Sequence, residues 1–254
     1  MTRTQRTFDI VVALGALVTL APLLALLALA VFVCDFRNPL FLGRRIGKDG
    51  RAFRMVKLRT MRSSTSGPQS TSAFDPRITW IGRILRRGKL DELPQLWNVL
   101  LGEMSFVGPR PQVESEVRLY TDAEHGLLRV RPGITDLASI VFSDESDILA
   151  GHSDPDAAYR RWIRPWKSRI ALTAIERASI RLTCQTLLCT LMNCIARRRT
   201  LDKIETWLRS QQVPEMVARM AGRREPLADW PPPVLKDRME AVLDRPTHFA
   251  TPAV

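Results

Sequence analysis

Histidine and cysteine are scarce in this chain of 254 residues, which limits the chemistry that it can perform. The three histidines are far apart, at positions 125, 152 and 248, so a histidine-based metal site or catalytic triad is hard to build. The cysteines stand at 34, 184, 189 and 194, and none belongs to a Cys-x-x-Cys pair. Steps of five residues rotate a helical side chain by about 140°, so the last three do not share one face. We therefore expect neither a cysteine metal site nor a disulfide framework, which fits a reducing cytosol.

Charged residues are absent from one long stretch, Ile10 to Cys34. This apolar run is long enough to cross a bilayer, for which about 20 residues suffice. It exceeds the apolar core of a signal peptide, and no small-residue cleavage site follows it. The sequence therefore predicts a membrane helix.

Two features distinguish this helix from a simple anchor. Pro22 stands in its middle, where proline removes a backbone hydrogen bond and kinks a helix. Both flanks are basic, and positive charge marks the cytoplasmic side of a membrane. The basic flanking residues are Arg3, Arg6, Arg37, Arg44, Arg45 and Lys48. A helix that enters, bends at Pro22 and returns explains both flanks, while a plain span stays open because proline is tolerated there too.

The formal net charge of +12 and a pI near 10.5 point to a polyanionic partner. Nucleic acid, an anionic membrane and phosphorylated small molecules all fit this charge. No nucleic-acid motif is present, and the aromatic residues are not interleaved with the basic runs as a base-stacking platform requires. Nucleic acid is therefore not expected as a partner, although a non-catalytic, membrane-tethered basic adaptor that binds nucleic acid or anionic lipid remains the alternative function.

After the apolar run, the sequence predicts a β-hairpin over residues 39–59, because Asp49-Gly50 separates two strand-like segments. Residues 62–76 form a polar loop, either a connector or a lid over a site. An amphipathic helix over 78–87 suits a membrane surface. A basic, aromatic surface helix over 155–170 and an apolar helix over 171–196 follow.

The most informative segment runs from residue 90 to residue 111. Asp91 and Glu92 stand at the start of an apolar helix, where Asp91 is a competent N-cap and both carboxylates meet the positive end of the helix dipole. Capping alone does not explain the nearby arginines, Arg83, Arg86 and Arg87, or the Pro109-Arg110-Pro111 turn. Paired carboxylates surrounded by cations indicate a metal ion and a phosphorylated substrate.

Motifs spread over roughly residues 6–170 resemble the bacterial sugar transferase family, the monotopic phosphoglycosyl transferases. The motifs that carry this resemblance are Arg6-Thr-Phe-Asp9, Arg44-Arg-Ile-Gly47, Phe53 to Met61, Asp75-Pro-Arg-Ile-Thr79, Ile81-Gly-Arg83, Leu90 to Val99, Met104 to Pro111 and Arg131-Pro-Gly-Ile-Thr135. Several of them in one order and at family spacing leave little room for coincidence.

The resemblance implies an α+β fold, mainly helical, with a re-entrant membrane helix broken at a proline, a small β-hairpin and amphipathic interfacial helices around the active site. Three regions are expected: the re-entrant helix (1–37), a cytosolic catalytic domain (38–200) and a tail (201–254) with one short helix and otherwise mostly disorder. The family transfers a sugar-1-phosphate from a nucleotide diphosphosugar, usually UDP-linked, to undecaprenyl phosphate. UMP leaves and Mg²⁺ is required, at the bacterial inner membrane, in the first membrane step of capsule, exopolysaccharide or O-antigen assembly.

Carried over by resemblance, Asp91 is the nucleophile that forms a phosphosugar-aspartyl intermediate, and Glu92 lies beside it at the Mg²⁺ site. The resemblance also implies that the Pro109-Arg110-Pro111 turn holds the uridine end of the donor. The other expected substrate-binding residues are Lys57, Arg59, Arg86, Arg87, Arg131 and Thr135. The sugar and the oligomeric state stay open, a homo-oligomer included.

Three residues depart from the family pattern. Ala21 precedes Pro22, where many members carry serine, and Asp136 and Ser139 replace the more usual glycine and glutamine after Thr135. Because the segment after Thr135 is expected near the site, Asp136 and Ser139 are candidates for altered substrate choice.

Overall fold

A computed structural model describes residues 3–62, 75–150, 152–225 and 227, and within them the chain is mostly helical, as the sequence predicted. The helices are α1 (Arg3–Asp35), α2 (Trp80–Arg87), α3 (Leu96–Leu101), α4 (Glu114–Val117), α5 (Leu137–Val141), α6 (Glu145–Leu149), α7 (Pro155–Ala158), α8 (Arg164–Glu176), α9 (Ile180–Asn193), α10 (Arg197–Ser210) and α11 (Glu215–Ala221). The strands are β1 (Leu40–Ile46), β2 (Ala52–Leu58), β3 (Ser105–Val107) and β4 (Gly133–Thr135). The expected loop at 62–76 lies almost wholly outside the described residues, as do residues 228–254 of the expected tail.

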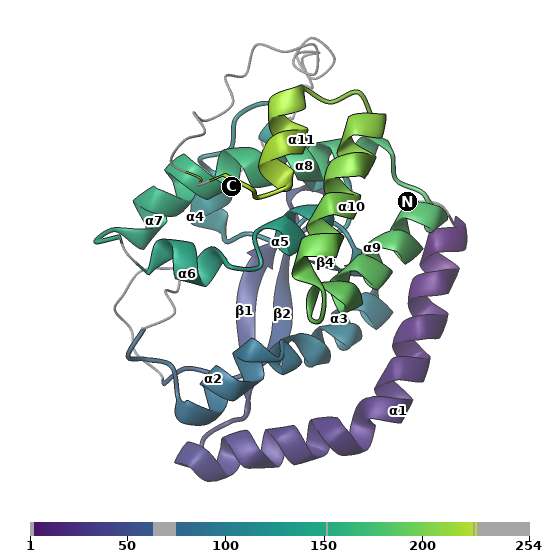
Figure 1. The fold of residues 1–254 in the computed structure, drawn as a ribbon. Helices are drawn as coiled ribbons and strands as arrows, with labels where there is room; N and C mark the ends of the chain where they lie inside the picture. The colour runs from purple at the N-terminus through teal and green to yellow at the C-terminus, as the bar shows by residue number, and fades with distance from the viewer. Residues whose placement is uncertain (1–2, 63–74, 151, 226, 228–254) are drawn as a thin grey trace, which may run out of the picture.

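Helix α1 is the apolar segment, and it is the one described helix that is long and apolar enough to cross a membrane. It contains Pro22, and Figure 1 shows it as two arms that meet at a bend. Most of its large side chains are exposed, Val11 and Val18 among them. Both arms contact the rest of the chain. Ala13 packs in a cluster with residues of β2, α3 and β3, and Val31 packs with Leu58 and Leu85.

The predicted hairpin is confirmed: β1 and β2 pair antiparallel, with Gly43 opposite Met55. A second pair, β3 with β4, is parallel and was not predicted. It brings the segment before Pro109 against the segment after Arg131. Glycine is required on both strands, since a Cβ on Gly108 would lie 2.5 Å from Arg131 O and one on Gly133 would lie 2.1 Å from Gly108 N.

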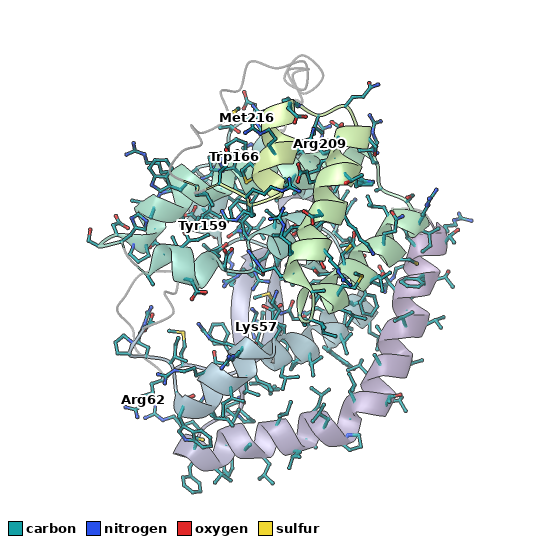
Figure 2. All side chains as sticks on the ribbon, in the orientation of Figure 1. Lys57, Arg62, Tyr159, Trp166, Arg209 and Met216 are labelled. Carbon is teal, nitrogen blue, oxygen red and sulfur yellow. The ribbon has the colours of Figure 1, made fainter. Side chains whose placement is uncertain are left out.

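The C-terminal half holds the main hydrophobic core, which is built by α5 to α11. Here the structure differs from the sequence prediction in two places. The segment 155–170 is not a surface helix: Ile163 and Trp166 are fully buried, and a π-helix (Tyr159–Ile163) joins α7 to α8. Trp166 and Met216 lie together in this upper part of the molecule in Figure 2. The expected helix over 171–196 is divided into α8 and α9, because Ser179 begins a new helix by accepting a hydrogen bond from Leu182 N.

The region expected as a tail is also partly core. Helices α10 and α11 bury Leu201, Ile204, Leu208 and Met220 against α5 and α8. The expected boundary between residues 200 and 201 therefore falls inside α10. The sequence prediction missed this packing because basic residues alternate with the apolar ones. Arginine stems and ion pairs surround the apolar face of these two helices.

Candidate active site

The carboxylates Asp91 and Glu92 lie in a 3-10 helix (Leu90–Gln95) that leads into α3. Asp91 is not an N-cap, which corrects the sequence prediction: the cap position belongs to Lys89, whose φ of 52° is left-handed. A left-handed φ is uncommon for a residue with a side chain and is often retained at functional sites. The tight turn buries Asp91, which is 7% exposed, against β2 and α2.

Glu92 is clamped between two cations. Its Oε1 accepts hydrogen bonds from Lys57 Nζ at 3.0 Å and from Arg110 Nη2 at 2.6 Å. Lys57 comes from β2 and Arg110 from the turn after β3, so two separate elements converge on one carboxylate. Burial alone would raise the pKa of Glu92, but Arg110 and Lys57 outweigh it and hold that pKa well below its ordinary value. Glu92 is therefore an ionised, fixed group.

Asp91 differs from its neighbour. Lys57, Arg86 and Arg110 act on it through their charge, and none of the hydrogen bonds just described reaches it. Burial raises the pKa of Asp91, and Lys57 offsets part of that effect. Burial likewise lowers the pKa of Lys57. A carboxylate that is surrounded by cations but not bound by them is free to attack an electrophile or to bind a metal ion.

The two neighbouring arginines of α2 have different surroundings. Arg86 donates from Nε to Thr60 Oγ1 at 2.8 Å and acts electrostatically on Asp91, whereas Arg87 is exposed. On the reaction that the resemblance implies, we expect Arg86→Gln to lower kcat/KM by about 10- to 100-fold, because it removes a fixed cation from beside the expected phosphoryl group. Arg87→Gln, the matched variant at the next position, should lower kcat/KM by less than about threefold. Equal losses in the two variants, measured as UMP release, would contradict this distinction.

The structure does not bring every expected substrate-binding residue to this cluster. Arg131 donates from Nε to Gly102 O at 2.6 Å, at the opposite end of α3 from Asp91. Arg6 of α1 binds two other carbonyls there, Val99 O at 2.6 Å and Leu100 O at 2.8 Å. Cations at a helix C-terminus complement its dipole. Arg6 thus fixes α1 onto α3, and Arg131 fixes the segment before β4 onto the same end of α3.

The structure places two other expected residues through different contacts. Thr135 is buried at the end of β4, with its hydroxyl 2.8 Å from Thr190 Oγ1 of α9. Arg59 follows β2 directly, and its backbone N–H donates to Pro39 O at 2.7 Å. Their roles toward a substrate stay predictions.

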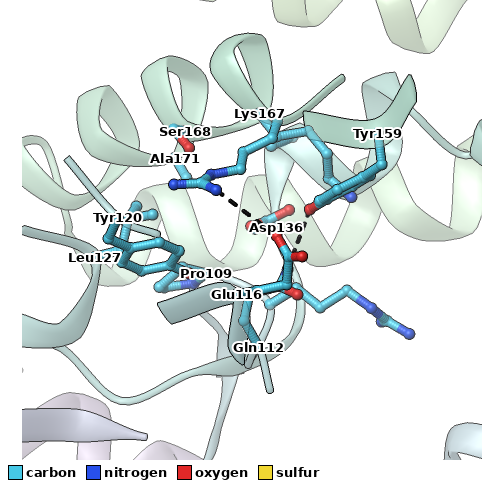
Figure 3. Close-up of a pocket in the computed structure, with 13 residues that line it drawn as sticks. Pro109, Gln112, Glu116, Tyr120, Leu127, Asp136, Tyr159, Lys167, Ser168 and Ala171 are labelled. Carbon is cyan, nitrogen blue, oxygen red and sulfur yellow. Dashed lines mark hydrogen bonds and ion pairs between the residues drawn. The ribbon is translucent and has the colours of Figure 1, made fainter. Parts of the chain in front are cut away.

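Sequence reasoning missed Lys167 and Tyr159, which line a pocket that begins at Pro109 and Arg110 (Figure 3). Lys167 Nζ pairs with Glu145 Oε2 at 2.7 Å. No sequence signal marked these residues, because they stand in the segment interpreted as a surface helix.

The residues fit a Mg²⁺ ion of the kind that binds through one or two carboxylates and substrate phosphates. Asp91 offers a carboxylate without a hydrogen bond to Lys57 or Arg110, and Glu92 adds a second one beside it. A site made by protein ligands alone is not expected, since the described residues contain no group of three or more His, Cys, Asp or Glu side chains placed to hold a metal.

Comparison with known proteins decides the family. The sequence model described as bacterial sugar transferase matches residues 1–197. The chain belongs to the bacterial sugar transferase family. The match includes α1, both strand pairs, the carboxylate pair and most of the core, and it ends at the first residue of α10.

Several curated relatives of this sugar transferase are similar over about half of the chain. Exopolysaccharide production protein ExoY of Sinorhizobium fredii is 40% identical over 153 residues, which cover 54% of the chain and 68% of that protein. Undecaprenyl-phosphate glucose phosphotransferase of Komagataeibacter xylinus is 45% identical over 146 residues, which cover 54% and 27%. UDP-glucose:undecaprenyl-phosphate glucose-1-phosphate transferase of Caulobacter vibrioides is 42% identical over 141 residues, which cover 54% and 53%. The family and these names identify the chain as an enzyme, a phosphoglycosyl transferase.

Proposed function

We propose that this sugar transferase moves a sugar-1-phosphate from a UDP-sugar to undecaprenyl phosphate and thereby starts exopolysaccharide, capsule or O-antigen assembly. The observation that carries the proposal is the asymmetric carboxylate pair. Glu92 is held by Lys57 and Arg110, while Asp91 is surrounded by cations without being bound by them. The names of the relatives supply the acceptor and the glucosyl and galactosyl donors.

The chemistry divides into two displacements at one phosphorus atom. In the first, an Asp91 oxygen attacks the β-phosphorus of the donor, the bond from that phosphorus to the UMP oxygen breaks, and UMP leaves with the electron pair. In the second, a phosphate oxygen of the lipid attacks the phosphosugar-aspartyl intermediate and releases the Asp91 carboxylate. Lys57, Arg86 and Arg110 are placed to stabilise the charge on the phosphoryl oxygens.

Mg²⁺ is proposed as the cofactor, held by Asp91 and Glu92 together with the donor phosphates. When bound, it would supply Lewis-acid neutralisation of the phosphate charge. Glu92 keeps its ion pairs with Lys57 and Arg110, and these contacts hold the two carboxylates in position to meet the donor phosphates. The Pro109-Arg110-Pro111 turn is proposed to contact the nucleotide.

The function is tested by intact mass. The purified enzyme is incubated with a panel of UDP-sugars and Mg²⁺ in the absence of lipid, and the mass should rise by one phosphosugar with release of UMP. Chelation of Mg²⁺ should prevent both, and added undecaprenyl phosphate should remove the label. Continued UMP release over many turnovers without a lipid acceptor would instead identify a hydrolase. Salt-sensitive DNA binding without UMP release would favour the basic adaptor.

The membrane topology is proposed to be re-entrant, with the catalytic domain on the cytosolic side of the bacterial inner membrane. Ile10 to Ala21 and Leu23 to Cys34 each span about 18 Å as helix, which is shorter than the roughly 30 Å hydrocarbon core. The first arm docks through Arg6 on α3 and the second through Val31 on Leu58 and Leu85, so both arms return to one catalytic body.

We therefore expect cysteines introduced at Gln5 and Asn38 to be labelled from the cytosolic side alone in intact-membrane preparations. The background needs Cys34, Cys184, Cys189 and Cys194 replaced by serine, since all four thiols are free and Cys184 and Cys194 are exposed. In Pro22→Ala, restored hydrogen bonding should straighten α1 and move position 5 to the far side. Labelling of position 5 from the periplasm in the variant that keeps Pro22 would refute the re-entrant topology.

A further inference from the structure

Arg110, whose guanidinium donates to Glu92, also lines a pocket. Its walls come from five parts of the chain: the Pro109–Gln112 turn, α4 with the residues just after it, the 3-10 helix Glu124–Arg129, the start of α5, and the π-helix with α8 (Figure 3). A donor whose β-phosphate lies between Asp91 and Arg110 would therefore extend one of its ends into this pocket. The question is whether that end is the nucleoside or the sugar.

The π-helix supplies one of the wall residues, and α8, which follows it, supplies Lys167. π-Helical turns are rare and frequently occur at functional sites. Here the turn places Tyr159 so that its hydroxyl accepts a hydrogen bond from Gln112 Nε2 at 3.2 Å, and it is followed by Lys167, which also lines the pocket. Both side chains are held by neighbours, so the pocket is preorganised.

The cations of this pocket are already neutralised. Lys167 is paired with Glu145, and Arg164 is paired with Glu124 at 2.6 Å and with Glu116 at 3.7 Å. A phosphate would gain little here, because each cation has its carboxylate in place.

The aromatic rings of the pocket are also partly occupied. Lys167 Nζ lies over the Tyr159 ring, 5.8 Å from its centroid, and Arg164 Cζ lies over the Tyr120 ring at 5.1 Å. Each ring therefore has a cation over one face and offers less stacking surface to a nucleobase. Tyr159 is also only 8% exposed.

Two buried carboxylates line the pocket instead. Glu116 is 9% exposed and accepts a hydrogen bond from Arg160 Nη1 at Oε1, while its Oε2 lies 3.7 Å from Arg164 Nη1 and accepts no hydrogen bond from any part of the chain that the structure describes. Asp136 is 5% exposed and uses Oδ1 to cap α5 at Ser139 N. A buried acceptor without a donor is costly, and a sugar hydroxyl is a donor that would satisfy it.

We infer that this pocket takes the sugar ring of the donor, with Glu116 and Asp136 as the residues that recognise its hydroxyl groups. The inference rests on the proposed function for the identity of the donor. Asp136 receives this role because it lies on the pocket wall. The nucleoside would then bind on the other side of the turn, near Pro111, which does not line the pocket.

The test measures binding alone, in full-length Asp91→Asn protein, so that no donor is consumed. Dissociation constants are measured for UDP-glucose, UDP-galactose and UMP, before and after adding Asp136→Asn, which keeps an oxygen to cap α5 but removes the charge. We expect the affinity for at least one UDP-hexose to fall about tenfold, with a changed ratio between the two epimers, since a hydrogen bond to a charged group is lost. UMP, which lacks the hexose, should bind as before.

Asp154→Asn is the matched control, because Asp154 caps α7 in the same way, at Ala157 N, but is exposed and outside the pocket. Glu116→Gln gives a second variant in case Asp136→Asn is unstable. Unchanged UDP-hexose binding in both variants, or UMP binding that weakens as much as donor binding, overturns the inference. Failure of the proposed function is separate, since it would appear as the absence of covalent labelling when Asp91 is present.

Discussion

Replacing Asp91 by asparagine is expected to abolish the phosphosugar label and to lower the rate of UMP release by roughly 10⁴-fold or more, the scale seen when a nucleophile is removed. The amide has nearly the shape of the carboxylate, so the bonds of Glu92 to Lys57 and Arg110 should persist. What is lost is the nucleophilic oxygen itself. Intact mass after incubation with a UDP-sugar and Mg²⁺ measures the label, and UMP release measures turnover.

Asp49→Asn is a suitable control for the Asp91 variant. Asp49 is exposed on the hairpin turn with a left-handed φ of 56°, a conformation that asparagine tolerates well. It should retain both label and turnover. Full turnover in Asp91→Asn would show that Asp91 is not the nucleophile. Glu92 would then be the nucleophile only if the label were lost in Glu92→Gln and kept in Asp91→Asn.

Arg110→Met should lower kcat/KM by about 10²- to 10³-fold, the cost of removing one donor aimed at the developing charge. The expected effect exceeds that of losing an ordinary ion pair because Arg110 also orients Glu92 through contacts at 2.6 Å and 3.4 Å. Arg118→Met is the matched control, since Arg118 pairs with Glu114 on the exposed face of α4 and should matter little.

The same variant carries a pH signature. Arg110 is a principal cause of the low pKa of Glu92, so its removal should raise that pKa. Glu92 would then take up a proton at a higher pH, and the acidic limb of the kcat/KM profile should move upward. An acidic limb that stays in place while activity falls would show that Arg110 acts on the substrate and not through Glu92.

The pair should also be strongly coupled. Once Arg110 is lost, Glu92→Gln should cost much less than it costs in the unaltered enzyme, because the two residues act through one contact. If the activation free energies lost in Arg110→Met and Glu92→Gln simply add in the double variant, the contact between Arg110 and Glu92 has no functional role.

Local patterns in the sequence were sufficient for several elements. The Asp49-Gly50 turn between two strand-like segments gave the hairpin, because turn chemistry is set by neighbouring residues. The amphipathic spacing of Ile81, Ile84 and Leu85 gave α2, which begins two residues later than expected. The uncharged stretch gave α1, since its length and composition favour one long apolar helix.

Long-range pairing was not accessible in the same way. The parallel contact of β3 with β4 joins strands of three residues each, too short to produce a period. The burial of Trp166 follows from its neighbours in α5 and α11, and its own segment, rich in arginine, suggested a surface. The ion pairs that neutralise these arginines come from Glu116 and Glu124, some 40 residues earlier in the chain.

By itself the sequence determined the family, the long apolar helix and the carboxylate pair, because motifs and composition are properties of adjacent residues. Only the tertiary structure decided which carboxylate is bound and which is free, since Lys57, Arg86 and Arg110 reach Asp91 and Glu92 from three different elements. It likewise placed Arg131 against the C-terminal end of α3 and brought Lys167 and Tyr159 into a pocket that Arg110 also lines. Charge at a site depends on distances through space, and the packing of the helices sets those distances.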